Sequence, residues 1–259
     1  MKIFLHIGTH KTGTKTVQWF LRDQAEALAR EGFLVPQSGT LSTIAGHHRL
    51  AWDIVPGPFP QAGAETGGEI LKDFLAELAV SDAHTAVVSS EDFHHLVDWP
   101  ARLKALEQAL IAAGHNPEFI MFVRSPDSYA KSLYWQLRMR NGLHWGFWRF
   151  VMQAITQGFV DWRGRRYHFD LRRYAQAWRR ATSCPLHIYS YEEAAVDDGL
   201  VRRFLEIIGA GHTLQVLARD ALTRNEGQAL MPATVQRLAG ILLRRRFSAP
   251  SFTSFKTPY

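Results

Sequence analysis

The chain of 259 residues is 46% hydrophobic and 12% aromatic, a composition that supports a large buried core and excludes an intrinsically disordered protein. Thirty Lys and Arg against 24 Asp and Glu give a formal net charge of +6, which favours anionic partners without identifying one. The single cysteine, Cys184, excludes an internal disulfide, and no apolar run approaches the roughly 18 residues of a membrane-spanning helix. We therefore expect a cytoplasmic protein whose membrane contact, if any, is peripheral.

The predicted elements alternate between strands and helices. An apolar strand, Lys2–Gly8, leads through a glycine-containing loop into a helix over Val17–Arg30. The further predicted strands are Phe33–Pro36, His84–Ser90, Phe119–Val123 and Leu186–Ser190, and the further predicted helices are His47–Ile54, Gly68–Val80, Pro100–Ala113, Ser128–Arg140, Trp145–Gln157, Leu171–Ala181 and Leu200–Ile208. This alternation predicts an α/β fold of three layers, in which helices flank a mostly parallel central sheet. We expect a single domain over residues 1–259, in which 56–68 form a loop and 248–259 a loosely held tail.

The loop between the first strand and the first helix, residues 8–16, reads Gly-Thr-His-Lys-Thr-Gly-Thr-Lys-Thr. Its glycines let main-chain N–H groups approach an oxyanion, the following helix adds its N-terminal dipole, and Lys11 and Lys15 add positive charge. This is the chemistry of a phosphate-binding loop, and it predicts a fold of the P-loop nucleotide-binding type. The Walker pattern of kinases and NTPases does not match, because Gly13 is followed by Thr14 rather than by lysine.

The run Lys11-Thr12-Gly13-Thr14 after an apolar strand resembles the 5′-phosphosulfate-binding loop of the sulfotransferases that use 3′-phosphoadenosine-5′-phosphosulfate (PAPS), in particular their bacterial branch. The resemblance implies that PAPS is the co-substrate and that 3′,5′-adenosine bisphosphate is the product. It also implies that Lys11 contacts the phosphosulfate and stabilises the leaving group. The other donor-binding residues expected in this loop are His10, Thr12, Gly13, Thr14, Lys15 and Thr16. Lys15 stands where the family usually has a second hydroxyl, so it either adds a charge to the phosphate site or marks an altered loop.

A second element of the resemblance follows the strand at 119–123. Arg124 ends this strand and Ser132 lies on the next helix, a spacing similar to that with which the family binds the 3′-phosphate. A guanidinium suits this task because its planar fork binds phosphate in a bidentate way, and the alternative is a surface arginine beside an ordinary helix cap. Weaker matches at Trp178, Tyr191-Glu192 and Arg224-Asn225 extend the resemblance over residues 2–240. The further candidates for 3′-phosphate binding are Arg224 and Arg244–Arg246, with a solvated basic face as the alternative.

Sulfuryl transfer needs a general base that takes the proton of the acceptor, and we predict that Glu91 has this role. Glu91 follows a strand whose carboxyl end lies at the sheet edge where open α/β folds bind their ligands. The resemblance implies a catalytic histidine or carboxylate at this strand end. The alternative is that Glu91 or Asp92 only caps the following turn. The histidines that remain as alternative bases are His10, His48, His94 and His95.

No metal ion is predicted, because the sequence contains neither a His-Glu-x-x-His motif nor a set of cysteine ligands. The expected acceptor is a hydroxyl or amine of a glycan, a glycolipid or a small metabolite, and nucleic acid is not an expected partner. Trp145, Trp148, Arg149 and Trp162–Arg166 mix aromatic and basic side chains, which suits sugar stacking, an acidic acceptor or ordinary packing. Two alternatives stay open: a P-loop kinase or NTPase acting with Mg²⁺ and ATP, and a non-catalytic module that binds nucleotide or nucleic acid.

Overall fold

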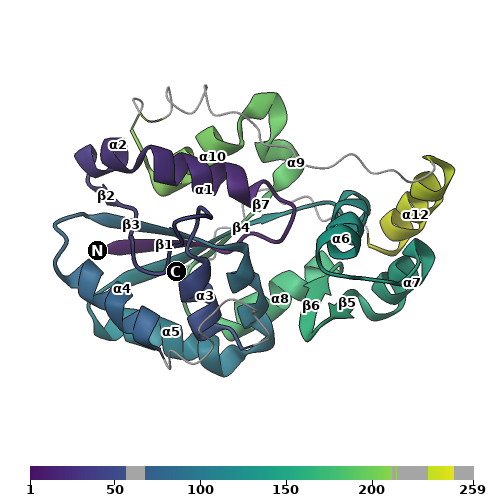
Figure 1. The fold of residues 1–259 in the computed structure, drawn as a ribbon, viewed down its shortest axis with the longest axis horizontal. Helices are drawn as coiled ribbons and strands as arrows, with labels where there is room; N and C mark the ends of the chain where they lie inside the picture. The colour runs from purple at the N-terminus through teal and green to yellow at the C-terminus, as the bar shows by residue number, and fades with distance from the viewer. Residues whose placement is uncertain (57–67, 212–213, 215–232, 248–259) are drawn as a thin grey trace.

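The computed structural model describes residues 1–56, 68–211, 214 and 233–247. At the centre of the described part is a parallel sheet of five strands in the order β2-β3-β1-β4-β7 (Figure 1). The central strand, β1, places Leu5 opposite Val88 of β3 and Phe119 of β4. The strands of this sheet are β1 (Lys2–His6), β2 (Phe33–Leu34), β3 (Thr85–Ser89), β4 (Asn116–Val123) and β7 (Leu186–Ser190).

Helices cover both faces of the sheet. Successive side chains of a strand point to opposite faces, so Ile3 and Leu5 of β1 pack in one hydrophobic cluster and Phe4 packs in another. The first face is covered by α3 (His48–Ile54), α4 (Glu69–Ala79), α5 (Pro100–Ala112) and α8 (Leu171–Ala181). The second is covered by α1 (Thr14–Asp23), α2 (Ala25–Arg30) and α10 (Leu200–Ile208), and α9 (Tyr191–Ala194) and the 3₁₀ segment η2 (Val196–Asp198) link β7 to α10. The predicted three-layer α/β fold is confirmed.

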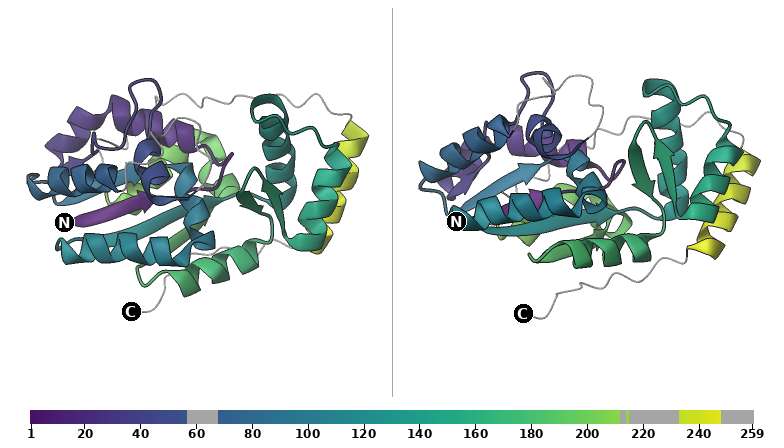
Figure 2. Two further views of the ribbon diagram at one scale, coloured as in Figure 1. Left: turned by 60° about the horizontal axis from the view of Figure 1, so that its bottom comes forward. Right: turned by 90° about the horizontal axis from the view of Figure 1, so that it is seen from below.

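A smaller lobe lies beyond the carboxyl ends of the strands (Figures 1 and 2). It has its own hydrophobic cluster, in which Phe150 and Phe169 are fully buried. An ion pair between Arg244 and Asp127 joins its last helix to its first. The elements of this lobe are α6 (Pro126–Arg140), α7 (Phe147–Gln157), α12 (Ala233–Arg246) and the antiparallel hairpin of β5 (Phe159–Trp162) and β6 (Arg165–His168).

The hairpin of β5 and β6 was not predicted from the sequence. Its two turn residues, Arg163 and Gly164, have φ of 51° and 72°, the backbone of a type I′ turn. The usual residues at the first position of such a turn are Asn, Asp and Gly, and here an arginine adopts the left-handed conformation. Strands of four residues with a basic residue at the turn carry little period-two signal, which explains the omission.

Two further predictions are refined. The helix expected over Val17–Arg30 begins earlier, at Thr14, and is interrupted at Gln24 between α1 and α2. The predicted loop at 56–68 falls almost wholly, and the predicted tail at 248–259 wholly, outside the described residues. The single domain stays a prediction.

Within the described ranges, no helix is long and apolar enough to cross a membrane.

Candidate functional site

The loop of residues 8–16 connects β1 to α1 and has a tightly constrained backbone. Lys11 and Gly13 both have positive φ, 65° and 71°. A Cβ atom at Gly13 would lie 2.4 Å from Cδ2 of Leu200, so this position accepts only glycine without a shift. The Thr12 hydroxyl donates to the Thr9 carbonyl over 2.6 Å and closes the loop from inside. Because α1 begins directly after Gly13, the loop lies at the positive end of a helix dipole.

The two lysines of this loop differ in exposure. Lys11 is partly buried, whereas Lys15 is exposed in the first turn of α1. The hydroxyls of Thr12 and Thr14 lie 3.5 Å apart and both side chains are buried. Lys15, which departs from the sulfotransferase pattern, is therefore exposed, whereas the hydroxyls of Thr12 and Thr14 before it are inside the loop.

Arg124 brings the two predicted phosphate-binding elements together. It is the first residue after β4, and its Nη1 donates to the Lys11 carbonyl over 3.0 Å. The guanidinium lies 5.1 Å from the ring centroid of Tyr191, a cation–π distance. Glu192 accepts from the backbone N–H and the hydroxyl of Ser125, at 3.0 and 2.7 Å. The ends of β1, β4 and β7 are thus linked at one edge of the sheet.

The helix α6 begins with Pro126 at its first position, where the missing N–H costs nothing. Ser125 precedes it without a capping hydrogen bond from its side chain, because its hydroxyl donates to Glu192 instead. The helix expected over Ser128–Arg140 therefore begins two residues earlier, at Pro126, and the Ser125 side chain does not cap it. Ser132 lies in the second turn of α6 and is partly buried.

The further candidates for 3′-phosphate binding, Arg224 and Arg244–Arg246, all follow α10 in the sequence. Arg224 lies outside the described residues. Arg244 pairs with Asp127, and Nε of Arg246 donates to the Ile155 carbonyl over 3.3 Å. Two of the three arginines at the end of α12 are therefore engaged within the small lobe.

Glu91 opens the 3₁₀ segment η1 (Glu91–Asp98), which follows β3. The cap of this segment is Ser90, whose hydroxyl accepts from the backbone N–H of Asp92 over 3.3 Å, so Glu91 and Asp92 do not merely cap the turn. The Glu91 carboxylate accepts from Nε2 of Gln18 over 2.9 Å and lies 4.0 Å from Nε2 of His48. Its side chain is 17% exposed.

Asp92, which sequence reasoning considered only as a turn cap, is the centre of a buried network. Its carboxylate accepts from Nε1 of Trp52 at 2.8 Å and from Nδ1 of His48 at 3.3 Å, and lies 3.6 Å from Nη1 of Arg165. Burial alone would raise the pKa of Asp92, but the hydrogen bond from His48 and nearby positive charge lower it below its usual value. Burial alone would lower the pKa of His48, but Asp92 and Glu91 raise it. His48 thus lies between two carboxylates, one at each ring nitrogen.

Three of the predicted alternative bases form a cluster of histidines. His10 of the phosphate loop, His94 and His95 each offer a ring nitrogen, and these atoms lie within 4.8 Å of one another. All three side chains are buried. Burial lowers the pKa of His10 to about 3 and that of His94 to about 4, and it holds the pKa of His95 well below its usual value. Burial therefore favours the neutral form of all three rings.

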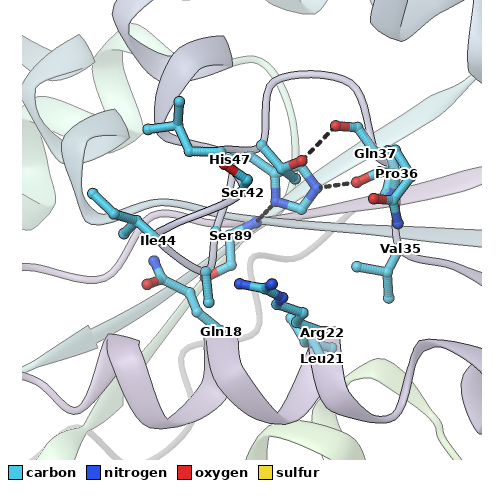
Figure 3. Close-up of a pocket in the computed structure, with 14 residues that line it drawn as sticks. Gln18, Leu21, Arg22, Val35, Pro36, Gln37, Ser42, Ile44, His47 and Ser89 are labelled. Carbon is cyan, nitrogen blue, oxygen red and sulfur yellow. Dashed lines mark hydrogen bonds between the residues drawn. The ribbon is translucent and has the colours of Figure 1, made fainter. Parts of the chain in front are cut away.

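A cavity of about 360 Å³ opens between α1 and the segment that precedes α3 (Figure 3). Gln18, which donates to Glu91, forms part of its wall. His47 forms another part: its Nε2 donates to the Pro36 carbonyl over 2.9 Å, and its Nδ1 accepts from the Ser89 N–H over 3.2 Å. Burial lowers the pKa of His47 to about 4. The cavity lining consists of Gln18, Leu21, Arg22, Val35, Pro36, Gln37, Thr40, Leu41, Ser42, Ile44, Ala45, Gly46, His47 and Ser89.

The aromatic and basic residues of the small lobe pack against one another and do not line this cavity. The Trp145 and Trp162 rings meet edge to face at 5.4 Å, and the Arg149 guanidinium lies 4.7 Å from the Trp145 ring centroid. Nε1 of Trp162 donates to the Asn141 carbonyl over 3.2 Å. Trp145, Arg149 and Trp162 thus pack together, whereas Trp148 is 40% exposed and Arg165 pairs with Asp92.

The strand order and the flanking helices define an α/β fold with a parallel central sheet, in which a glycine-containing loop joins β1 to α1. No protein-family model and no curated protein matches the sequence. Among solved structures, the chain is similar to a sulfotransferase from Alicyclobacillus acidocaldarius, with 13% identity, a TM-score of 0.50 and coverage of 95% of this chain and 96% of that chain. It is also similar to mouse sulfotransferase SULT7A1 complexed with PAP, with 11% identity, a TM-score of 0.45 and coverage of 96% of this chain and 85% of that one. The first likeness shows that this chain has the sulfotransferase fold.

Proposed function

We propose that this protein is a sulfotransferase that moves the sulfuryl group of PAPS to a hydroxyl or amine of an acceptor. The observation that carries the proposal is the 3.0 Å hydrogen bond from Arg124 to the Lys11 carbonyl, which joins the two elements expected to hold the 5′- and 3′-phosphates. The fold shared with the Alicyclobacillus sulfotransferase over 95% of the chain supports it.

The donor binds across the ends of β1 and β4. Thr12, Gly13 and Thr14 hold the 5′-phosphate with hydroxyls and main-chain N–H groups at the start of α1. Lys11 contacts the phosphosulfate, where its ammonium stabilises the charge that develops on the leaving phosphate. Arg124 and Ser132 bind the 3′-phosphate, and the Tyr191 ring behind the guanidinium restricts its orientation.

The transfer step is an in-line displacement at sulfur. An acceptor oxygen forms the new S–O bond while the bond from sulfur to the 5′-phosphate oxygen breaks, and the electron pair of that bond stays on 3′,5′-adenosine bisphosphate. The acceptor proton passes to the Glu91 carboxylate. Gln18 orients this carboxylate through its 2.9 Å hydrogen bond, and His48 lies 4.0 Å away to stabilise its charge.

The acceptor binds in the cavity beside Gln18, whose volume is in the range of small-molecule sites. Its wall combines apolar side chains such as Leu21 and Ile44 with polar ones such as Arg22 and His47 (Figure 3). This mixture suits a glycan, glycolipid or small metabolite that presents a hydroxyl next to an apolar part.

The test is calorimetric titration of the protein with 3′,5′-adenosine bisphosphate, in parallel with ATP and Mg²⁺. We expect metal-independent binding of the bisphosphate, weakened about 10- to 100-fold by Lys11→Ala and by Arg124→Ala, since each removes a charge-assisted hydrogen bond. The control variants are Lys104→Ala and Arg138→Ala, which remove exposed positive charges outside the site. A preference for ATP with Mg²⁺ would refute the proposal in favour of the kinase alternative.

A further inference from the structure

The transfer step proposed above does not use the cluster of His10, His94 and His95, which has the composition of a metal site. It joins two segments that are distant in sequence: His10 in the phosphate loop, and His94 and His95 in η1. The exposed fractions of the three side chains are 6%, 1% and 3%. The ring centroids of His94 and His95 lie 3.8 Å apart, and that of His10 lies 4.9 Å from His94.

Most of the ring nitrogens in this cluster have no hydrogen-bond partner within the described part of the chain. Nε2 of His10, Nε2 of His94 and both ring nitrogens of His95 are buried and unpaired. Unpaired buried polar atoms are costly, so a cluster of four at one place needs a physical explanation. A bound cation that accepts three lone pairs provides one.

The orientation of His94 fits the role of a ligand. Its Nδ1 donates to the Glu91 carbonyl over 2.5 Å, which fixes the tautomer and leaves the Nε2 lone pair directed away from that bond. Metal-binding histidines commonly donate their second N–H to a carbonyl or carboxylate in this way. The Tyr174 hydroxyl in turn donates to the His94 carbonyl over 3.2 Å, so the main chain of this segment is held as well.

The electrostatic surroundings of the cluster are mixed. The carboxylate of Asp92 favours a positive charge at His10, whereas the guanidinium of Arg165 opposes it. These two groups lie 3.6 Å apart and partly neutralise each other.

We propose that His10, His94 and His95 bind one transition-metal ion of the zinc class. Three imidazole nitrogens suit Zn²⁺, Co²⁺, Ni²⁺ or Cu²⁺, and three protein ligands leave a fourth position for a water molecule or an anion. Tetrahedral bonds to Zn²⁺ of about 2.0–2.1 Å place two ligand nitrogens about 3.3 Å apart, so separations of up to 4.8 Å must shorten by as much as about 1.5 Å. The ion would fasten the segment that bears Glu91 to the loop that bears Lys11. The proposal does not rest on the sulfotransferase function, because it concerns metal binding alone.

The experiment uses the full chain without a histidine tag, dialysed against a chelator and then freed of it. Calorimetric titration with ZnCl₂ is expected to give one ion per chain. Each of His10→Ala and His95→Ala is expected to weaken the affinity at least about tenfold. The control is His144→Ala, which removes an exposed histidine from the small lobe and is expected to leave the affinity unchanged. If the unsubstituted chain and all three variants bound Zn²⁺ with equal affinity, the ion would be bound by other groups and the proposal would be overturned.

A second measurement on the unsubstituted protein does not depend on the folding of any variant. Titration with CoCl₂ is expected to give the strong visible absorption bands of a four-coordinate ion, and X-ray absorption of the Zn²⁺ complex is expected to show about three imidazole ligands. The weak spectrum of six-coordinate aqueous Co²⁺, or a shell of oxygen ligands around Zn²⁺, would show that the cluster is only packed core.

Discussion

The phosphate loop and the Glu91 side of the site are neighbours, but they are built in different ways. The loop owes its shape to the main chain: Gly13 has a φ of 71°, and the Lys11 carbonyl accepts from Arg124. The Glu91 side owes its shape to pairs of side chains, in which His48 lies between Glu91 and Asp92. The loop should therefore be intolerant of added atoms, whereas the Glu91 side should tolerate changes of shape better than changes of charge.

The largest effect is expected from Glu91→Gln. Glutamine keeps the size of the side chain and can still accept from Gln18, but it cannot take a proton. We expect transfer to fall about 10²- to 10⁴-fold, while the affinity for 3′,5′-adenosine bisphosphate stays unchanged. The rate is measured as release of the bisphosphate from PAPS in the presence of a panel of hydroxyl acceptors.

The matched control for this substitution is Glu118→Gln. The Glu118 side chain is 16% exposed, close to the 17% of Glu91, but it pairs with Lys2 and His187 away from the loop. Its replacement should leave transfer unaffected. Equal activity of the two variants would mean that another group takes the proton, and His48 would be the first to examine.

The next largest effect is expected from Gly13→Ala. The new Cβ would clash with Leu200. The alanine would also have to adopt a left-handed backbone conformation, which alone costs about 1–2 kcal/mol. Gly114→Ala is the control, because Gly114 has a similar φ of 79° and nothing within 4 Å of its Cβ position. Thermal denaturation and calorimetry should show that both variants lose stability and that only Gly13→Ala loses donor affinity. Unchanged donor affinity in Gly13→Ala would contradict a loop set by main-chain geometry.

A smaller effect is expected from Asp92→Asn, which keeps the shape of the side chain and removes its charge. The pKa of His48 should fall, because the carboxylate that raises it is lost and burial remains. Stability should fall by about 1–3 kcal/mol as the partners of Asp92 lose a charged acceptor. The pKa is measured by NMR titration of labelled histidine, with Asp98→Asn, which removes the partner of His168 instead, as the control. An unchanged His48 pKa would show that Asp92 does not govern this ring.

The last effect concerns acid stability and depends on His47, a residue of the cavity wall. Burial lowers the pKa of His47 to about 4, so between pH 6.5 and 4 the unfolded chain binds a proton that the folded chain does not. Stability is therefore lost as pH falls through this window, by up to about 1.4 kcal/mol per pH unit from this residue. Urea denaturation at several pH values, in the presence of a chelator, gives the free energy of unfolding as a function of pH. This free energy should change less steeply with pH for His47→Gln than for the unsubstituted chain. The exposed His144→Gln serves as control, and an equal slope for His47→Gln would count against this assignment.

Features encoded in short stretches were predictable from the sequence. The loop from Gly8 to Thr16 follows an apolar strand and precedes a helix, so its position at the sheet edge could be inferred from local pattern alone. Arg124 was predictable for the same reason, because it directly follows the apolar run of β4. The link between them, a hydrogen bond across 113 residues of sequence, could not be seen in either stretch.

What sequence reasoning missed depends on segments that meet only in the fold. Arg165 reaches Asp92 because an unpredicted hairpin carries it there. The histidine cluster escaped the search for metal motifs because His10 and His94 belong to different elements, and motif spacing detects only ligands on one element or loop. The cavity wall at 35–47 is irregular and has no periodic pattern to read.

The ion pair between Arg244 and Asp127 has a consequence for the order in which the chain is made. The helix α6, which carries Ser132, packs in a lobe that is completed by α12. A ribosome therefore releases the sheet and its phosphate loop long before it releases the helix that completes the lobe. We expect the nascent chain to form the loop of residues 8–16, proposed to bind the 5′-phosphate, before α12 completes the surroundings of Ser132, proposed to bind the 3′-phosphate.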